Sequence, residues 1–191
     1  QANELLDQNA KSTVIKELQE GKSFGIAKRM GLPYEPYAFR TVMENLEDNE
    51  WWAAQLIGDD YRVDELLHYI EHSIDFEKYI YEPFEHSADE GLSVAPDIFD
   101  FVLQALRHKV GKGEQFMRTG LISWKRRLKN GSIKVLQCWI EDSGKPLKEI
   151  SPDLHSYLAD VVKAGDCEED LKDLMIAILD NRYPGKQNNL V

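Results

Sequence analysis

The stretch EPYAFRTVMENL, Glu35 to Leu46, indicates which fold class the chain adopts. Pro36 stands near its start, and proline is tolerated in the first turn of a helix because the nitrogen there needs no intrahelical partner. The apolar residues that follow recur every three or four positions, which is the period of one face of an α-helix: Ala38, Phe39, Val42, Met43 and Leu46. The stretch therefore predicts an amphipathic helix whose apolar face packs against other helices.

The same arrangement returns twice, after Pro96 and after Pro152, at spacings of 60 and 56 residues. Apolar residues follow the three prolines at matching offsets: Ala38, Val42 and Leu46; Ile98, Val102 and Leu106; Leu154, Leu158 and Val162. Two explanations remain open. Either the chain contains a diverged helical repeat, or any amphipathic helix that begins at a proline produces these offsets.

Most of the remaining chain shows the same helical period, and no segment alternates between apolar and polar residues over more than a few positions. We expect about ten or eleven short helices with tight connections. The predicted fold class is all-α, as an irregular helical bundle or a short stack of helical hairpins. We expect one domain over residues 1–182, followed by a frayed C-terminal tail over 183–191.

Two of the expected helices lie on either side of a turn signal in the second half of the chain. The first runs from Phe116 to Leu128 and ends at the pair Asn130-Gly131, which is typical of turns. The second runs from Ile133 to Ile140, with Ser132 as its cap. The sequence therefore predicts a break near residue 130.

The net charge of −11 is unevenly distributed along the chain. Residues 61–104 hold 11 acidic and 2 basic side chains, whereas residues 105–134 hold 1 acidic and 9 basic side chains. We expect the cationic side of the helix over 116–128 to dock on the acidic helices before it, through Lys125 and Arg127. An acidic protein is steered toward basic partners and repels nucleic acid at long range.

Aromatic residues are interspersed among the acids of residues 61–104, and aromatics are favoured anchors of protein interfaces. We therefore expect a non-enzymatic protein that presents a negative helical surface to a basic protein partner, as an inhibitor, an immunity protein or an adaptor does. The predicted partner-binding residues are Asp64, Glu65, Tyr69, Glu71, Asp75, Glu77, Tyr81, Glu82 and Phe84.

An alternative interpretation starts from residues 11–48, which resemble a helix-turn-helix. Ala27 and Gly31 have the spacing of that motif, in which the alanine permits close approach of the second helix and the glycine takes the left-handed turn. The resemblance implies a DNA-binding regulator, although the second helix offers few base-reading side chains. The cations that would contact nucleic acid are Lys28, Arg29, Arg40, Lys125, Arg126 and Arg127.

A third interpretation comes from LLHYIEHSI, residues 66–74, where His68, Glu71 and His72 have the order His-x-x-Glu-His. This order resembles the zinc motif of the inverted-zincin peptidases, and it implies a downstream glutamate ligand such as Glu149, with Glu71 as the base.

The apolar positions of the same helix argue against a zinc site. They place His68 and His72 on the opposite face, toward water, and the strands of that peptidase family are absent from the pattern. We expect no metal and no cofactor.

No other catalytic set stands out, and the chain shows neither a signal peptide nor a run of about 20 apolar residues that could cross a membrane. Cys138 lies in an apolar stretch and is expected to be a buried thiol, while Cys167 stands at a helix start. Two cysteines outside any Cys-x-x-Cys pair indicate a reducing compartment. We therefore expect a cytoplasmic protein without a membrane span, and the sequence leaves its oligomeric state open.

Overall fold

A computed structural model describes residues 2–81, 96–165 and 167–182 of the chain, and every regular element in these ranges is a helix. The predicted all-α class is therefore confirmed. Two predicted partner-binding residues, Glu82 and Phe84, lie outside the described residues, as does the tail over 183–191.

The chain forms two compact units, residues 1–69 and residues 70–191, and the boundary falls within one helix. The single domain expected over residues 1–182 stays a prediction, because two compact units can still unfold in one cooperative step. The two units are described separately below.

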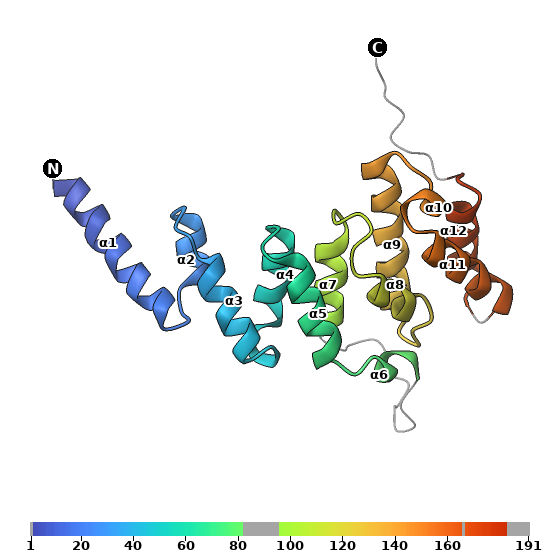
Figure 1. The fold of residues 1–191 in the computed structure, drawn as a ribbon, viewed down its shortest axis with the longest axis horizontal. Coiled ribbons are helices and arrows are strands. Elements are labelled where there is room, and N and C mark those ends of the chain that lie inside the picture. Colours follow the sequence, from blue (N-terminus) through green and yellow to red (C-terminus); the bar gives the residue numbers. More distant parts are fainter. Residues whose placement is uncertain (1, 82–95, 166, 183–191) are drawn as a thin grey trace, which may run out of the picture. The chain divides into compact units, whose positions relative to one another are not determined.

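Unit 1 holds, in chain order, α1 (Ala2–Gln19), α2 (Phe24–Arg29), α3 (Glu35–Glu44), the short 3-10 helix η1 (Glu47–Asn49), α4 (Glu50–Gly58) and the first part of α5 (Val63–Ser73). Figure 1 shows these elements in blue to green. α3 packs against α1 and α4, and α1 also packs against α2.

Two buried aromatic rings of unit 1, those of Phe24 and Tyr34, contact the half-buried Trp52. The ring of Phe24 meets it edge-on with centroids 5.1 Å apart, and the ring of Tyr34 lies 5.7 Å away. Ala27 is fully buried, and Gly31 has a φ of 67°, in the left-handed region; the helix-turn-helix itself stays a prediction. Helix α3 begins beside Pro36, as its sequence predicts.

Unit 2 holds the rest of α5 and then α6 (Glu77–Ile80), α7 (Ile98–Leu106), α8 (Glu114–Leu121), α9 (Arg126–Ser143), α10 (Leu147–Ile150), α11 (Pro152–Ala164) and α12 (Glu169–Leu179). α9, drawn in orange in Figure 1, packs against α7, α8, α10 and α12. Ten of its 18 residues are buried, including Trp139, whose indole N–H donates to the Leu106 carbonyl oxygen at 2.8 Å.

The predicted break near residue 130 is wrong, because Asn130 and Gly131 lie inside α9. Gly131 is needed there for close packing rather than for a turn. A Cβ at this position would lie 2.9 Å from the Leu103 Cδ1 atom of α7, a separation that real Cβ atoms do not reach. A glycine inside a helix costs about 1 kcal/mol relative to alanine. The gain from burying α9 against α7 therefore outweighs this cost and the turn preference of the Asn-Gly pair.

The expected helix over 116–128 is instead two helices, because the chain breaks between α8 and α9. The backbone N–H of Trp124 and the hydroxyl of Ser123 both donate to the carbonyl oxygen of Tyr79, at 3.2 and 2.5 Å. These bonds satisfy the polar groups that the break releases. The break also turns α9 back against α8.

The contact between α8 and α9 is tightest at Gly120. A Cβ there would overlap the Ser132 hydroxyl and would lie 3.2 Å from the Ser132 Cβ and 3.3 Å from the Leu128 carbonyl oxygen. Ser132, predicted to be a helix cap, is instead fully buried within α9. Its hydroxyl has no hydrogen-bond partner in the described part of the chain.

Gly120→Ala is expected to lower the free energy of unfolding by about 1–3 kcal/mol, because the added methyl group overpacks the α8–α9 contact. Adding Ser132→Ala should recover part of this loss, since it removes the overlapping hydroxyl. Gly58→Ala in α4 is the matched control, where nothing lies within 4 Å of the added Cβ. Chemical denaturation measures all three variants, and equal stability of the two single alanine variants would contradict the packing argument.

Candidate functional site

The predicted acidic surface starts on α5, whose two sides differ in chemistry. Leu66, Leu67 and Ile70 are buried. Asp64, Glu65, His68 and His72 are exposed, and we call these four residues the α5 face. Asp64 and Glu65 lie in the first turn of the helix, where carboxylates also complement the positive end of the helix dipole. The position of the two histidines agrees with the helical periodicity of the sequence.

The other predicted partner-binding residues differ in exposure. Tyr69 is half-buried, and its hydroxyl donates to the Met43 carbonyl oxygen at 3.1 Å. Glu71 is also half-buried. In unit 2, Asp75 accepts the backbone N–H of Glu77 at 2.9 Å, and Tyr81 is 69% exposed. Tyr81 is therefore the most accessible aromatic residue of the predicted set among the described residues.

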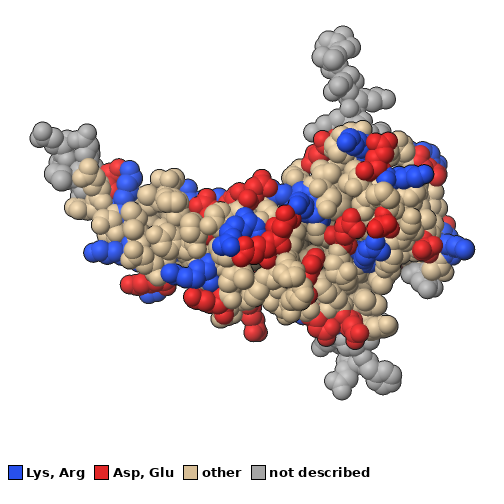
Figure 2. Space-filling view, viewed as in Figure 1, with Lys and Arg blue, Asp and Glu red and all other residues tan. Residues whose placement is uncertain are grey.

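Unit 1 carries an excess of acid beyond the α5 face. Residues 1–69 hold 13 acidic and 7 basic side chains. Figure 2 shows acidic side chains, with some Lys and Arg among them, over the region that α4 and α5 occupy in Figure 1. Trp51 of α4 is 48% exposed in this unit. The neighbouring Trp52 is half-buried and packs edge-on against the Trp51 ring, with centroids 4.5 Å apart.

Asp59 organises a small polar cluster that the sequence did not reveal. Lys28 donates to its carboxylate at 2.6 Å, and the hydroxyl of Tyr34 donates to the same oxygen. Burial, followed by the Asp59 carboxylate, raises the pKa of Tyr34 above its usual range, so this residue stays a hydrogen-bond donor.

The basic segment pairs with acids on α7, as expected. Lys125 lies 3.5 Å from the carboxylate of Asp97, and Arg127 lies 2.6 Å from that of Asp100. Both acids belong to the acidic residues 61–104. The expectation that Lys125 and Arg127 dock on this acidic stretch is therefore confirmed.

The start of α12 supplies a second set of acids, which the sequence did not indicate. Arg126 pairs with Asp170 and lies 3.8 Å from Glu168. Lys129 is only 9% exposed, and its ammonium lies 3.1 Å from the Glu168 carboxylate. A hydrogen bond from its own backbone lowers the pKa of Glu168, and Lys129 and Arg126 lower it further against the effect of burial.

These contacts occupy most of the cations proposed for nucleic acid. Lys125, Arg126 and Arg127 pair with carboxylates, as does Lys28 through Asp59. Arg40 donates to the Gln19 carbonyl oxygen at 2.9 Å. A paired cation releases fewer counterions from a phosphate backbone, so the pairing weakens the case for this interpretation. DNA binding stays a prediction.

The zinc interpretation gains no support from side-chain placement. His68 and His72 are exposed on α5, and Glu149 is exposed on α10. Within residues 2–81, 96–165 and 167–182, no group of three or more His, Cys, Asp or Glu side chains could hold a metal ion.

Cys138 is buried, as expected, and Cys167 is half-buried. Comparisons of the chain with protein-family models, with curated proteins and with solved structures find no match. Across the described residues, no helix combines the length and the apolar character required to cross a membrane. A functional proposal therefore depends on the side chains of this chain alone.

Glu168→Gln is expected to lower the free energy of unfolding by about 1–2 kcal/mol at neutral pH, because it leaves the Lys129 ammonium with a weaker partner. The loss is smaller than the ~3–5 kcal/mol of a fully buried pair, since water reaches the Glu168 carboxylate.

The fold lowers the pKa of Glu168. The stability that Glu168→Gln removes should therefore be largest above the ordinary pKa of 4.5, and it should shrink as the pH falls below that value. Urea denaturation at several pH values measures the effect. The control is Glu169→Gln, at an exposed neighbouring position, and a loss of the same size there would sink the explanation.

Asp100 provides a pH test of opposite sign. Burial raises the pKa of Asp100, against the opposing effects of a backbone hydrogen bond from Asp97 and the charge of Arg127. The folded chain therefore holds a proton on Asp100 more tightly than the unfolded chain does. The contribution of Asp100 to wild-type stability should fall as the pH rises from 3.8 to the folded pKa.

Asp100→Asn removes this dependence and keeps an oxygen that can accept the Asp97 N–H. The variant should gain stability relative to the wild type as the pH rises through that window, and the two should converge below it. Thermal unfolding between about pH 3.5 and pH 7 measures the difference. A variant that instead loses relative stability as the pH rises would show that the Arg127 pair outweighs burial.

Proposed function

We propose that this chain is a non-enzymatic interaction protein that binds a basic protein partner through the α5 face, in the manner of an inhibitor, an immunity protein or an adaptor. The observation that supports the proposal is the exposure of Asp64 and Glu65 on α5, in a unit with nearly twice as many acids as bases.

Electrostatic complementarity explains why such a face would serve association. Exposed charges of one sign raise the rate at which an oppositely charged partner arrives, by attraction that salt screens within about 10 Å at 0.1 M. Affinity then needs anchors that lose contact with water, and exposed aromatic rings are the favoured type. Unit 1, which holds Asp64 and Glu65, offers Trp51.

The acids of the α5 face also have a structural role that the test must separate from binding. Glu65 pairs with Arg62 one turn away, and both side chains are about half exposed. Such a pair contributes about 0–1 kcal/mol, so its loss leaves the fold intact.

The test is a charge reversal on the full-length chain, Asp64→Lys with Glu65→Lys. Affinity capture from an extract of the native source, followed by mass spectrometry, is expected to recover a basic protein with the wild type. We expect at least about tenfold less of it with the variant, at about 50 mM salt, where steering is strongest. The recovery with wild type should fall as salt is raised.

The matched control is Glu169→Lys with Asp173→Lys, which changes the net charge by the same amount on exposed positions of α12. Glu169 lies in the first turn of α12, as Asp64 and Glu65 lie in the first turn of α5. This control should capture the partner as the wild type does. Recovery of no basic protein at low salt, or an equal loss in the control, would reject the proposal.

A further inference from the structure

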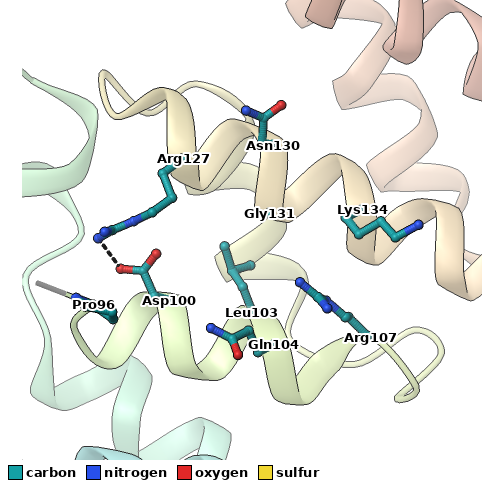
Figure 3. A pocket seen from close by; sticks show the side chains of 9 residues that line it. All are labelled: Pro96, Asp100, Leu103, Gln104, Arg107, Arg127, Asn130, Gly131 and Lys134. Atoms are coloured by element: carbon teal, nitrogen blue, oxygen red, sulfur yellow. Dashed lines mark hydrogen bonds and ion pairs between the residues drawn. The ribbon is translucent and has the colours of Figure 1, made fainter. Parts of the chain in front are cut away.

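A cavity of about 360 Å³ lies between α7 and α9 within unit 2. This volume is within the range of sites for small molecules, about 300–1,000 Å³. Figure 3 shows the side chains that line the cavity, which are Pro96, Asp100, Leu103, Gln104, Arg107, Arg127, Asn130, Gly131 and Lys134.

The floor of the cavity is set by the close contact of the two helices. Leu103 of α7 is buried against Gly131 of α9, which has no side chain to fill the space above it. The amides of Gln104 and Asn130 are exposed at the rim and can donate hydrogen bonds. The site therefore combines a small apolar floor with polar donors.

One end of the cavity is electrically balanced. Asp100 is 6% exposed and accepts hydrogen bonds from Arg127 at 2.6 Å and from the backbone N–H of Asp97 at 3.2 Å. The dashed line in Figure 3 marks its pair with Arg127. Among the described residues, this carboxylate is the one acid that lines the cavity, and Arg127 offsets its charge.

The other end carries two cations, Arg107 and Lys134. Both are exposed, and within the described ranges neither has a carboxylate within ion-pair distance. In Figure 3 the guanidinium of Arg107, the residue that follows α7, extends toward α9, whereas the Lys134 side chain extends along α9 away from it. By contrast, Lys125, Arg126 and Lys129 all pair with acids. Exposed cations without such a partner stand out in a chain with a net charge of −11.

The two cations also act on one buried thiol, that of Cys138 in α9. Burial raises the pKa of the Cys138 thiol, while Lys134 and Arg107 both act to lower it. Two acids later in the helix act in the opposite direction, and of these Asp142 already pairs with His108 at 2.7 Å. Arg107 follows α7 and Lys134 belongs to α9, and both line the cavity.

We propose that this cavity binds a small phosphorylated molecule, with the phosphate held between Arg107 and Lys134. A phosphate group carries a charge of about −1.5 to −2 at neutral pH, which matches two cations. The guanidinium fork binds two of its oxygens at once, and the lysine adds a point charge. The remaining volume suits the organic part of the ligand, which would contact Leu103 and the amides of Gln104 and Asn130.

This inference is independent of the proposed function, because the cavity lies outside the α5 face. Isothermal titration of the full-length chain with inorganic phosphate, pyrophosphate and AMP, at about 50 mM salt, is the experiment. We expect saturable binding. Tighter binding of AMP than of phosphate would assign the cavity to a phosphate ester, and binding of the inorganic anions alone would assign it to the free anion.

Arg107→Ala with Lys134→Ala should weaken binding at least about tenfold, which corresponds to about 1.4 kcal/mol. Arg107→Lys alone should give an intermediate loss, because it keeps the charge and removes the fork. The matched control is Lys145→Ala with Lys148→Ala, which removes two exposed cations elsewhere in unit 2. Circular dichroism checks that each variant keeps its helices.

Three outcomes would overturn the proposal. The first is no saturable binding of any of the three probes at about 10 mM, a concentration well above a typical dissociation constant. The second is an equal loss of binding in the control variant. The third is binding of a single-stranded RNA oligonucleotide by a chain that binds none of the small probes, which would move the site to a different class of ligand.

Discussion

The burial of α9 among α7, α8, α10 and α12 is the constraint on which unit 2 depends. Two glycines make it possible, because Gly120 and Gly131 allow neighbouring backbones to approach where a Cβ would collide. The indole of Trp139 is also satisfied inside, by the Leu106 carbonyl oxygen. Close packing of this kind is sensitive to a single methyl group, so the two glycines matter more than their small size suggests.

The burial of α9 creates an electrostatic problem at its beginning. Cations cluster there, although the start of a helix is its positive end. α7 and α12 also begin nearby and bring acids at their N-caps and in their first turns, where carboxylates are favourable. Each acid thereby serves its own helix and a cation of α9: Asp97, Asp100, Glu168 and Asp170. This arrangement explains the acid–base–acid order of charge along the chain.

Neutralising these cations leaves two surfaces of opposite chemistry to interact with other molecules. The α5 face, which we propose binds a basic protein, exposes the acids Asp64 and Glu65. The cavity between α7 and α9 presents Arg107 and Lys134 and suits a phosphate. The two proposals depend on different residues, so each can fail without the other. Most of the cations first assigned to nucleic acid are already occupied by side chains or backbone of this chain.

The sequence by itself determined the all-α class, the outward placement of His68 and His72, and the docking of Lys125 and Arg127 on acidic residues. These features follow from helical periodicity and from local charge, which act over a few residues or between neighbouring segments. Only the tertiary structure decided that Asn130 and Gly131 continue a helix, because packing against α7 outweighs the local turn preference. It also decided that Arg107 and Lys134 share a cavity, since the two residues come from different helices and no sequence period relates them.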